Sequence, residues 1–251
     1  MTKQAIDISK HNGTIDFKTL KESGIDTVII RAGYGKVISQ KDIRFEEYYR
    51  LARQYGFDIG VYWYSYAVTK SDALKEAQTC LNVIHGKQFE LPVFFDIEET
   101  CCKEQATDLV ETFCSTIEQA GYYAGIYASK CFVLENLSDD NLRKYDLWLA
   151  HYTQKTDYKG NYGIWQYSST GHVNGIKGDV DLDIVYKDYP AIMKRLGLNG
   201  FEKQDITPVI SKPNDIDDTL LDIELLINGK TLFHDKYNYN LGDDDYDSDI
   251  V

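Results

Sequence analysis

The chain has 251 residues, of which 43% are hydrophobic and 27% charged, and its formal net charge is −13. This composition is typical of a globular protein and excludes a disordered or fibrous one, and no apolar run approaches the roughly 18–20 residues that cross a bilayer. Residues 201–251 hold 13 Asp and Glu against 4 Lys. The acidity therefore lies mainly at the C-terminal end, and it argues against a nucleic-acid partner, which needs a basic surface.

The N-terminal residues enter a strand-like pattern directly, so no signal peptide is visible. Either the protein stays inside the cell, or it leaves by another route, or a leader has been removed. The five cysteines show no C-x-x-C spacing and no neighbouring His cluster, so they predict mostly reduced thiols and no metal site.

Short apolar, β-branched and aromatic runs alternate with amphipathic segments along the first 188 residues. Eight strands are predicted, at Ala5–Ser9, Thr27–Ala32, Asp58–Tyr64, Leu91–Ile97, Ala124–Tyr127, Asp146–Ala150, Gly163–Tyr167 and Val180–Val185. Five helices are predicted, at Phe17–Ser23, Ile43–Tyr55, Ser71–His85, Gln105–Ala120 and Asp139–Lys144. The alternation implies a parallel sheet that closes into an irregular TIM-like (β/α)5(β)3 barrel, an α/β fold, within residues 1–198.

Beyond the barrel the composition changes. Residues 199–219 contain Pro208, Pro213 and an acidic patch, which predict a linker. Residues 220–251 are predicted to contain a β-hairpin, because Asn228-Gly229 separates two apolar runs. The aspartate-rich end from Asp243 is predicted to be a solvated tail, since the Gly and the closing Glu of an EF-hand calcium loop are missing.

Acidic residues stand at the ends of three predicted strands. Asp7 ends the first, Asp96 and Glu98 end the fourth about 6.6 Å apart at Cα, and Asp181 lies in the eighth. Crowded carboxylates are costly, but crowding raises the pKa of one so that it can donate a proton while another stays ionised. Glycoside hydrolysis needs that division. The alternative is that each acid caps a helix or pairs with a base such as Arg31 or Lys10.

Aromatic residues are frequent on the predicted strands, with 20 Tyr and 3 Trp in the chain. Sugar rings stack on aromatic faces, and Tyr and Trp add a polar tip for hydroxyl groups, although each residue alone is more often part of a core. The residues expected to bind substrate are Arg31, Tyr62, Tyr64, Tyr127 and Trp165. The five His show no zinc-binding spacing, so no metal is expected.

Eight ordered stretches closely resemble glycoside hydrolase family 25, the Chalaropsis-type lysozymes of bacteria and phages. They include Ala5–Gly13, Val28–Gly35, Gly60–Ser65, Pro92–Glu98, Gly121–Tyr127, Trp148–Ala150, Trp165–Tyr167 and Val180–Asp183. The resemblance covers residues 4–188 and implies the same barrel. It departs from the family at Asp183, where Asn is common, and at His151, where Gln is common.

The resemblance also implies an activity: hydrolysis, without a cofactor, of the β-1,4 bond between N-acetylmuramic acid and N-acetylglucosamine in bacterial peptidoglycan. It implies that Glu98 is the general acid/base and Asp96 its anionic partner, with Asp7 and Asp181 completing the cluster. Asp-x-Glu on one strand resembles enzymes in which the substrate's 2-acetamido group attacks and configuration is retained; a covalent glycosyl-aspartate is the competing version. Action at the bacterial wall, after secretion or phage release, is expected, with no membrane insertion.

Three other functions are compatible with parts of the sequence. A non-catalytic glycan-binding module would need a broken carboxylate set. A metal-dependent carbohydrate deacetylase would need His ligands beside Asp7 or Asp96. An interaction protein that acts through residues 201–251 could coexist with catalysis.

Overall fold

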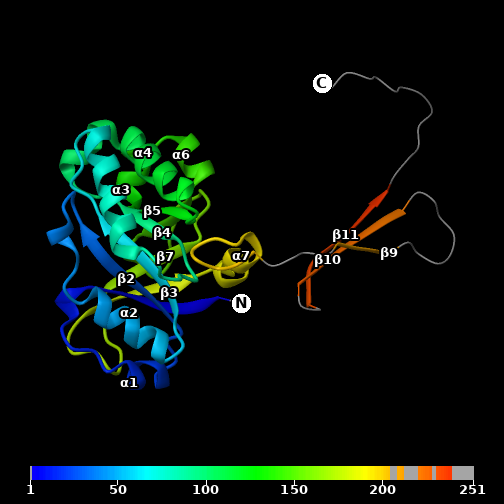
Figure 1. Cartoon of the computed structure of the whole chain (residues 1–251), viewed down its shortest axis with the longest axis horizontal. Coiled ribbons are helices and arrows are strands. Elements are labelled where there is room, and N and C mark those ends of the chain that lie inside the picture. The colour runs from blue at the N-terminus through cyan, green and yellow to red at the C-terminus, as the bar shows by residue number, and fades with distance from the viewer. Residues whose placement is uncertain (1, 204–207, 212–219, 228–229, 239–251) are drawn as a thin grey trace. The chain divides into compact units, whose positions relative to one another are not determined.

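Eight strands close into a barrel in chain order (Figure 1). They are β1 (Lys3–Ile8), β2 (Thr27–Tyr34), β3 (Asp58–Tyr64), β4 (Val93–Asp96), β5 (Ala124–Ser129), β6 (Asp146–Ala150), β7 (Ile164–Gly171) and β8 (Val180–Val185). The computed structural model describes residues 2–203, 208–211, 220–227 and 230–238. The chain divides into two compact units, Met1–Glu202 and Lys203–Val251. The barrel confirms the predicted fold class.

One strand departs from the expected parallel sheet. Strands β1 to β7 pair in parallel, but β8 runs antiparallel to both β7 and β1. The prediction of a parallel sheet is therefore wrong for the last strand. The reason is the short connection between β7 and β8, which holds no crossover helix, and a parallel neighbour needs such a crossover.

The five predicted helices are present, and the described part of the chain holds two more. The structure contains α1 (Phe17–Glu22), α2 (Phe45–Gln54), α3 (Lys70–Ile84), α4 (Ala106–Gln119), α5 (Lys130–Asn136), α6 (Asp139–Lys144) and α7 (Tyr189–Leu196). Three short 3-10 helices lie at Lys10–Asn12, Ile38–Gln40 and Thr100–Gln105. None of the described helices is both long and apolar enough to span a bilayer.

The unpredicted helix α7 has clear signals at both ends. The Asp188 side chain accepts a hydrogen bond from the Ala191 amide, and Pro190 stands in the first turn. Gly197 ends the helix with a left-handed φ of 66°. These are the residues that favour a helix start and stop, so the sequence contained the information for α7.

Two apolar clusters fill the barrel unit. The larger lies between the strands and the helices; α2, for example, buries Phe45, Tyr48 and Ala52 on one face. The smaller lies inside the barrel and includes Ala5 and Phe94. Because strand residues two apart share a face, Asp7 and Asp96 follow these two residues on the inner face. The alternation that places apolar residues inside the barrel therefore also places these two carboxylates on the inner face, at the C-terminal ends of β1 and β4.

The second unit contains a three-stranded antiparallel sheet in the order β11-β10-β9. Strands β10 (Leu220–Ile227) and β11 (Lys230–Asn238) pair as the predicted hairpin, with an irregularity between Leu225 and Leu226. Strand β9 (Pro208–Ser211) pairs with β10 inside the interval for which the sequence predicts a linker. The predicted Asn228-Gly229 turn and the predicted acidic tail from Asp243 lie outside the described residues.

Candidate active site

A cavity of about 380 Å³ opens at the C-terminal ends of β1 to β7. Its wall contains all four acids that the sequence predicts, Asp7, Asp96, Glu98 and Asp181. Among residues 2–203 none of these carboxylates forms an ion pair with a Lys, Arg or His side chain. The alternative in which each acid pairs with a base is thus not what the structure contains: Arg31 pairs with Asp42, at 2.8 Å.

The reversed direction of β8 brings Asp181 to the site. Asp181 lies near the start of β8, opposite Asp7 in the antiparallel register. A parallel β8 would place this residue at the other end of the barrel. Burial raises the pKa of Asp181 to about 6; its own backbone amide lowers the value and the charge of Glu98 raises it.

Asp96 and Glu98 occupy two different environments. Asp96 ends β4 and is only 4% exposed, and its Oδ1 has no hydrogen-bond partner among the described residues. Burial raises the pKa of Asp96 well above its usual range, the charge of Glu98 adds to this, and Arg31 partly offsets it. A buried polar atom without a partner is rare in folded proteins, so Oδ1 is available to a ligand group.

Glu98 follows β4 and stands at the mouth of the cavity, with an exposed side chain. The chain stays extended there, because the Ile97 amide donates to the Tyr127 carbonyl at 3.0 Å. Surrounding protein atoms raise the pKa of Glu98 by desolvation, Tyr64 lowers it, and the charge of Glu99 raises it again. Glu99 itself accepts a hydrogen bond of 2.7 Å from the Tyr64 hydroxyl. A glutamate with a raised pKa at a cavity mouth can deliver a proton.

Gln166, which was not among the predicted site residues, connects three residues of the cavity. Its Nε2 donates to Asp7 Oδ2 at 2.7 Å, and its Oε1 accepts from Tyr127 at 2.8 Å and from Tyr152 at 2.9 Å. Burial raises the pKa of Asp7 well above its usual range, the charges of Asp183 and Asp181 add to this, and Gln166 lowers it. Gln166 lies two residues after Ile164 of the inner cluster, so strand alternation places it on the inner face of β7. This alternation was the signal in the sequence that could have identified it.

Asp183 lies beneath the cluster and is fully buried. Its Oδ1 accepts a hydrogen bond of 2.8 Å from Trp148 Nε1, and its Oδ2 has no partner among the described residues. Burial raises the pKa of Asp183 well above its usual range; Trp148 lowers it and the charge of Asp181 raises it. Asp183 therefore adds a further carboxyl group under the site rather than in its wall.

Four of the five predicted substrate-binding residues line the cavity: Arg31, Tyr62, Tyr64 and Tyr127. Trp165 does not. It lines an adjoining hollow of about 560 Å³, which shares Tyr152 with the cavity, and its Nε1 donates to the His151 carbonyl. The structure thus separates Trp165 from the carboxylates.

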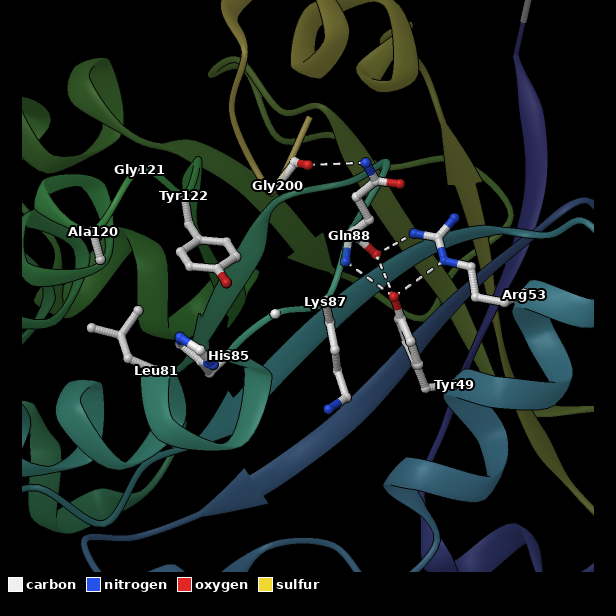
Figure 2. Close-up of a pocket in the computed structure, with 11 residues that line it drawn as sticks. Tyr49, Arg53, Leu81, His85, Lys87, Gln88, Ala120, Gly121, Tyr122 and Gly200 are labelled. Carbon is white, nitrogen blue, oxygen red and sulfur yellow. Dashed lines mark hydrogen bonds between the residues drawn. The ribbon is translucent and has the colours of Figure 1, made fainter. Parts of the chain in front are cut away.

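A larger hollow, of about 620 Å³, lies at the opposite end of the barrel, where the chain enters β4 and β5 (Figure 2). Tyr49, Gln88 and Arg53 are joined there by hydrogen bonds, and Gln88 Nε2 donates to the Gly200 carbonyl at 2.9 Å. Arg53 also pairs with Glu90. Tyr49, Gln88 and Arg53 thus bond to one another, and no Asp or Glu within residues 2–203 lines this hollow, so it does not resemble a glycosidase active site.

The cavity with its acids at the C-terminal strand ends agrees with comparisons to known proteins. The family model of glycosyl hydrolases family 25 matches residues 6–176. The chain belongs to this family. An autolytic lysozyme of Clostridium acetobutylicum is 32% identical over 183 residues, which are 72% of this chain and 55% of that protein.

Two solved structures at 27% identity share the fold. The modular autolysin LytC of Streptococcus pneumoniae, solved in complex with a synthetic peptidoglycan ligand, has a TM-score of 0.67 over 74% of this chain and 47% of that one. The CTP1L endolysin has a TM-score of 0.69 over 76% of this chain and 69% of that one. The chain thus spans about half the length of the autolytic lysozyme and of LytC.

Proposed function

We propose that this family 25 chain is an N-acetylmuramidase, which hydrolyses the β-1,4 bond between N-acetylmuramic acid and N-acetylglucosamine in bacterial peptidoglycan. The observation that carries the proposal is the gathering of Asp7, Asp96, Glu98 and Asp181 in one cavity. Membership of a family of glycoside hydrolases supports it, as do a relative described as a lysozyme and a structural neighbour bound to a peptidoglycan ligand. Its place of action is then the bacterial wall, reached by secretion or phage release.

In the proposed reaction Glu98 protonates the oxygen of the scissile bond. Its raised pKa lets the carboxyl group keep its proton to a higher pH than an ordinary glutamate does. After the aglycone leaves, the same residue, now ionised, takes a proton from the incoming water. The proton therefore passes through one side chain in both halves of the reaction.

Asp96 is proposed to hold the 2-acetamido group of the sugar. Its unpartnered Oδ1 can accept a hydrogen bond from the acetamido N–H. As the acetamido oxygen attacks the anomeric carbon, positive charge develops on that nitrogen. This charge opposes the desolvation that raises the pKa of Asp96 in the free site, so it favours the ionised carboxylate, which in turn stabilises the charge. Two successive inversions then give net retention.

Asp7 and Asp181 are proposed to contribute to the electrostatic potential around Asp96 and Glu98, and not to react themselves. Asp7 is held by Gln166 and Asp181 lies opposite it. No cofactor is required in this scheme.

The first experiment measures the release of reducing ends from purified peptidoglycan, with mass analysis of the products and NMR of the newly formed anomer. We expect reducing N-acetylmuramic acid ends in the β configuration. Glu98→Gln is expected to lower the rate by about 10²-fold or more, as loss of a general acid implies. Glu99→Gln is the matched control, because it makes the same replacement of a carboxylate by an amide at the next residue. It is expected to keep most of the rate.

Other outcomes would change the proposal in defined ways. Reducing N-acetylglucosamine ends would keep a hydrolase and change the bond, and the α anomer would contradict retention. No release from several wall types would favour a glycan-binding module without catalysis. The division into a catalytic barrel and a C-terminal appendage is part of the proposal. Its boundary lies near residue 203 rather than at a linker over 199–219, because Asn199 is buried in the barrel unit and β9 pairs with β10. Deletion of residues 203–251 is expected to change kcat/KM on soluble fragments by less than about twofold.

A further inference from the structure

A second hollow, of about 250 Å³, adjoins the catalytic cavity on the side of β2 and β3. Six residues line it: Lys10, His11, Arg31, Tyr34, Tyr64 and Tyr66. His11, Arg31 and Tyr64 also line the catalytic cavity, so the two spaces are direct neighbours. We call it the Lys10 hollow.

The Lys10 hollow is cationic, next to a cavity walled by carboxylates. Lys10 Nζ lies 5.9 Å from the centre of the Tyr34 ring, and the Arg31 guanidinium lies 6.0 Å from it. Arg31 is already paired with Asp42. Lys10 forms no ion pair within residues 2–203, so its ammonium group is available to an anionic ligand.

Tyrosine rings form the rest of the wall. Tyr66 is 49% exposed and its ring contacts those of Tyr34 and Tyr64, with centres 6.2 Å and 5.2 Å apart. Such a surface favours a ligand that has an apolar or pyranose part beside its charge. A volume of about 250 Å³ is below the roughly 300–1,000 Å³ of pockets that enclose a whole ligand. It therefore suits a substituent of a larger substrate.

The hollow on the other side of the cavity has a different character. It is the one that contains Trp165, and none of its nine lining residues is charged. Uncharged sugar rings are well matched by such a wall of aromatic and hydroxyl groups. The two flanks of the carboxylate cavity thus differ in charge, and only the Lys10 side offers a partner to an anion.

We propose that the Lys10 hollow binds a carboxylate that the muramyl residue carries on its O3 substituent, either the lactyl carboxylate itself or a carboxylate of a peptide attached to it. N-acetylglucosamine has no such group, so this contact would help to select which sugar occupies the adjacent subsite. Lys10 gives the charge-assisted hydrogen bond, and Tyr34 and Tyr66 pack against the apolar part of the substituent. The inference rests on the proposed function in one respect, that the ligand is a peptidoglycan strand. It does not require that the chain hydrolyses this strand.

The test measures dissociation constants by titration calorimetry in the Glu98→Gln background, so that no turnover interferes. The ligands are muramyl tetrasaccharides in three forms: with free lactyl carboxylates, with peptide stems, and with every carboxylate converted to an amide. Lys10→Gln is expected to weaken binding about five- to tenfold for a carboxylate-bearing form, the size of one half-exposed charge-assisted bond. Lys155→Gln, the same charge change in the loop after β6 at an exposed side chain, is the matched control and is expected to change nothing.

The three forms separate the two sources of the carboxylate. If the lactyl group is bound, Lys10→Gln weakens the form with free lactyl carboxylates. If the peptide is bound, it weakens only the form with peptide stems. In both cases the amide form binds the two variants equally, because the anionic partner of Lys10 is gone.

Three results would overturn the proposal: an equal effect of Lys10→Gln on the amide form, an equal effect of Lys155→Gln, or no effect on any form. In the last case a shifted pH–rate profile would show that Lys10 only compensates the charge of the carboxylates. Failure of the proposed function is a separate outcome. It would be the absence of hydrolysis by the wild-type protein while binding still depends on Lys10 and on the carboxylate.

Discussion

The barrel has a hollow at each end, about 620 Å³ where the chain enters β4 and β5 and about 380 Å³ at the C-terminal ends of the strands. In the larger one Tyr49, Gln88 and Arg53 satisfy one another by hydrogen bonds. In the smaller one the four predicted carboxylates, Asp7, Asp96, Glu98 and Asp181, form no ion pairs within residues 2–203, and Asp96 has a buried oxygen without a partner among the described residues. Polar groups that the fold leaves unsatisfied, rather than volume, distinguish a candidate catalytic site from a structural one.

The largest effect is expected from Asp96→Asn. Loss of the charge that faces the developing positive charge should lower kcat by about 10²–10³-fold, the range for one electrostatic group in an active site. His85→Ala in the larger hollow is the control and should keep the wild-type rate. The measurement is steady-state release of reducing ends. A comparable loss in both variants would mean that the two hollows do not differ as proposed.

Asn199→Ala is expected to affect stability and not chemistry. Asn199 is fully buried with a left-handed φ of 55°; its Nδ2 donates to the Leu91 carbonyl and its Oδ1 accepts from the Tyr123 amide, both at 2.7 Å. Leaving both backbone groups unpaired should cost about 2–4 kcal/mol of unfolding free energy. Urea denaturation measures it, with the exposed Asn174→Ala as control. An unchanged midpoint, or a loss of activity per folded molecule, would contradict the assignment.

Asp183→Asn is expected to stabilise the protein increasingly as the pH rises. Burial raises the pKa of Asp183 in the folded state well above its usual range. Its favourable contribution is complete below the unfolded pKa of about 3.9 and is lost as pH rises towards the folded pKa, by up to about 1.4 kcal/mol for each pH unit. In Asp183→Asn the amide oxygen can still accept the hydrogen bond from Trp148 Nε1, and the side chain has no charge whose burial would cost stability at higher pH. The gap in unfolding free energy between variant and wild type should therefore be wider at pH 7 than at pH 5, and a constant gap would contradict it.

The smallest expected effect is a shift of the pH–rate profile in Glu99→Gln. Glu98 must hold a proton to act, so kcat/KM should fall as pH rises through its raised pKa. The negative charge of Glu99 contributes to that rise, so its removal should move the alkaline limb to lower pH. The rate at the optimum should stay within about twofold of the wild-type rate, because Glu99 is not a reacting group. An unmoved alkaline limb would mean that another group controls it.

Local pattern was enough to predict much of the barrel. The strands β3, β6 and β8 have the predicted bounds, and Asp7, Asp96, Glu98 and Asp181 line one cavity as expected. Alternation on a strand and the rule that chemistry lies at strand ends are short-range arguments, and both apply here. Helix α7 was missed although Asp188, Pro190 and Gly197 are the usual signals of its ends.

The sequence by itself determined the order of the eight strands and of five helices, the family, and which carboxylates stand at strand ends, because each of these depends on local sequence patterns. Only the tertiary structure decided that β8 runs antiparallel, which sets Asp181 opposite Asp7. It also decided that Gln166 holds Asp7 and that Trp165 lies outside the carboxylate cavity. These contacts join residues up to 174 positions apart, and their geometry follows from how the barrel closes, which no local pattern contains.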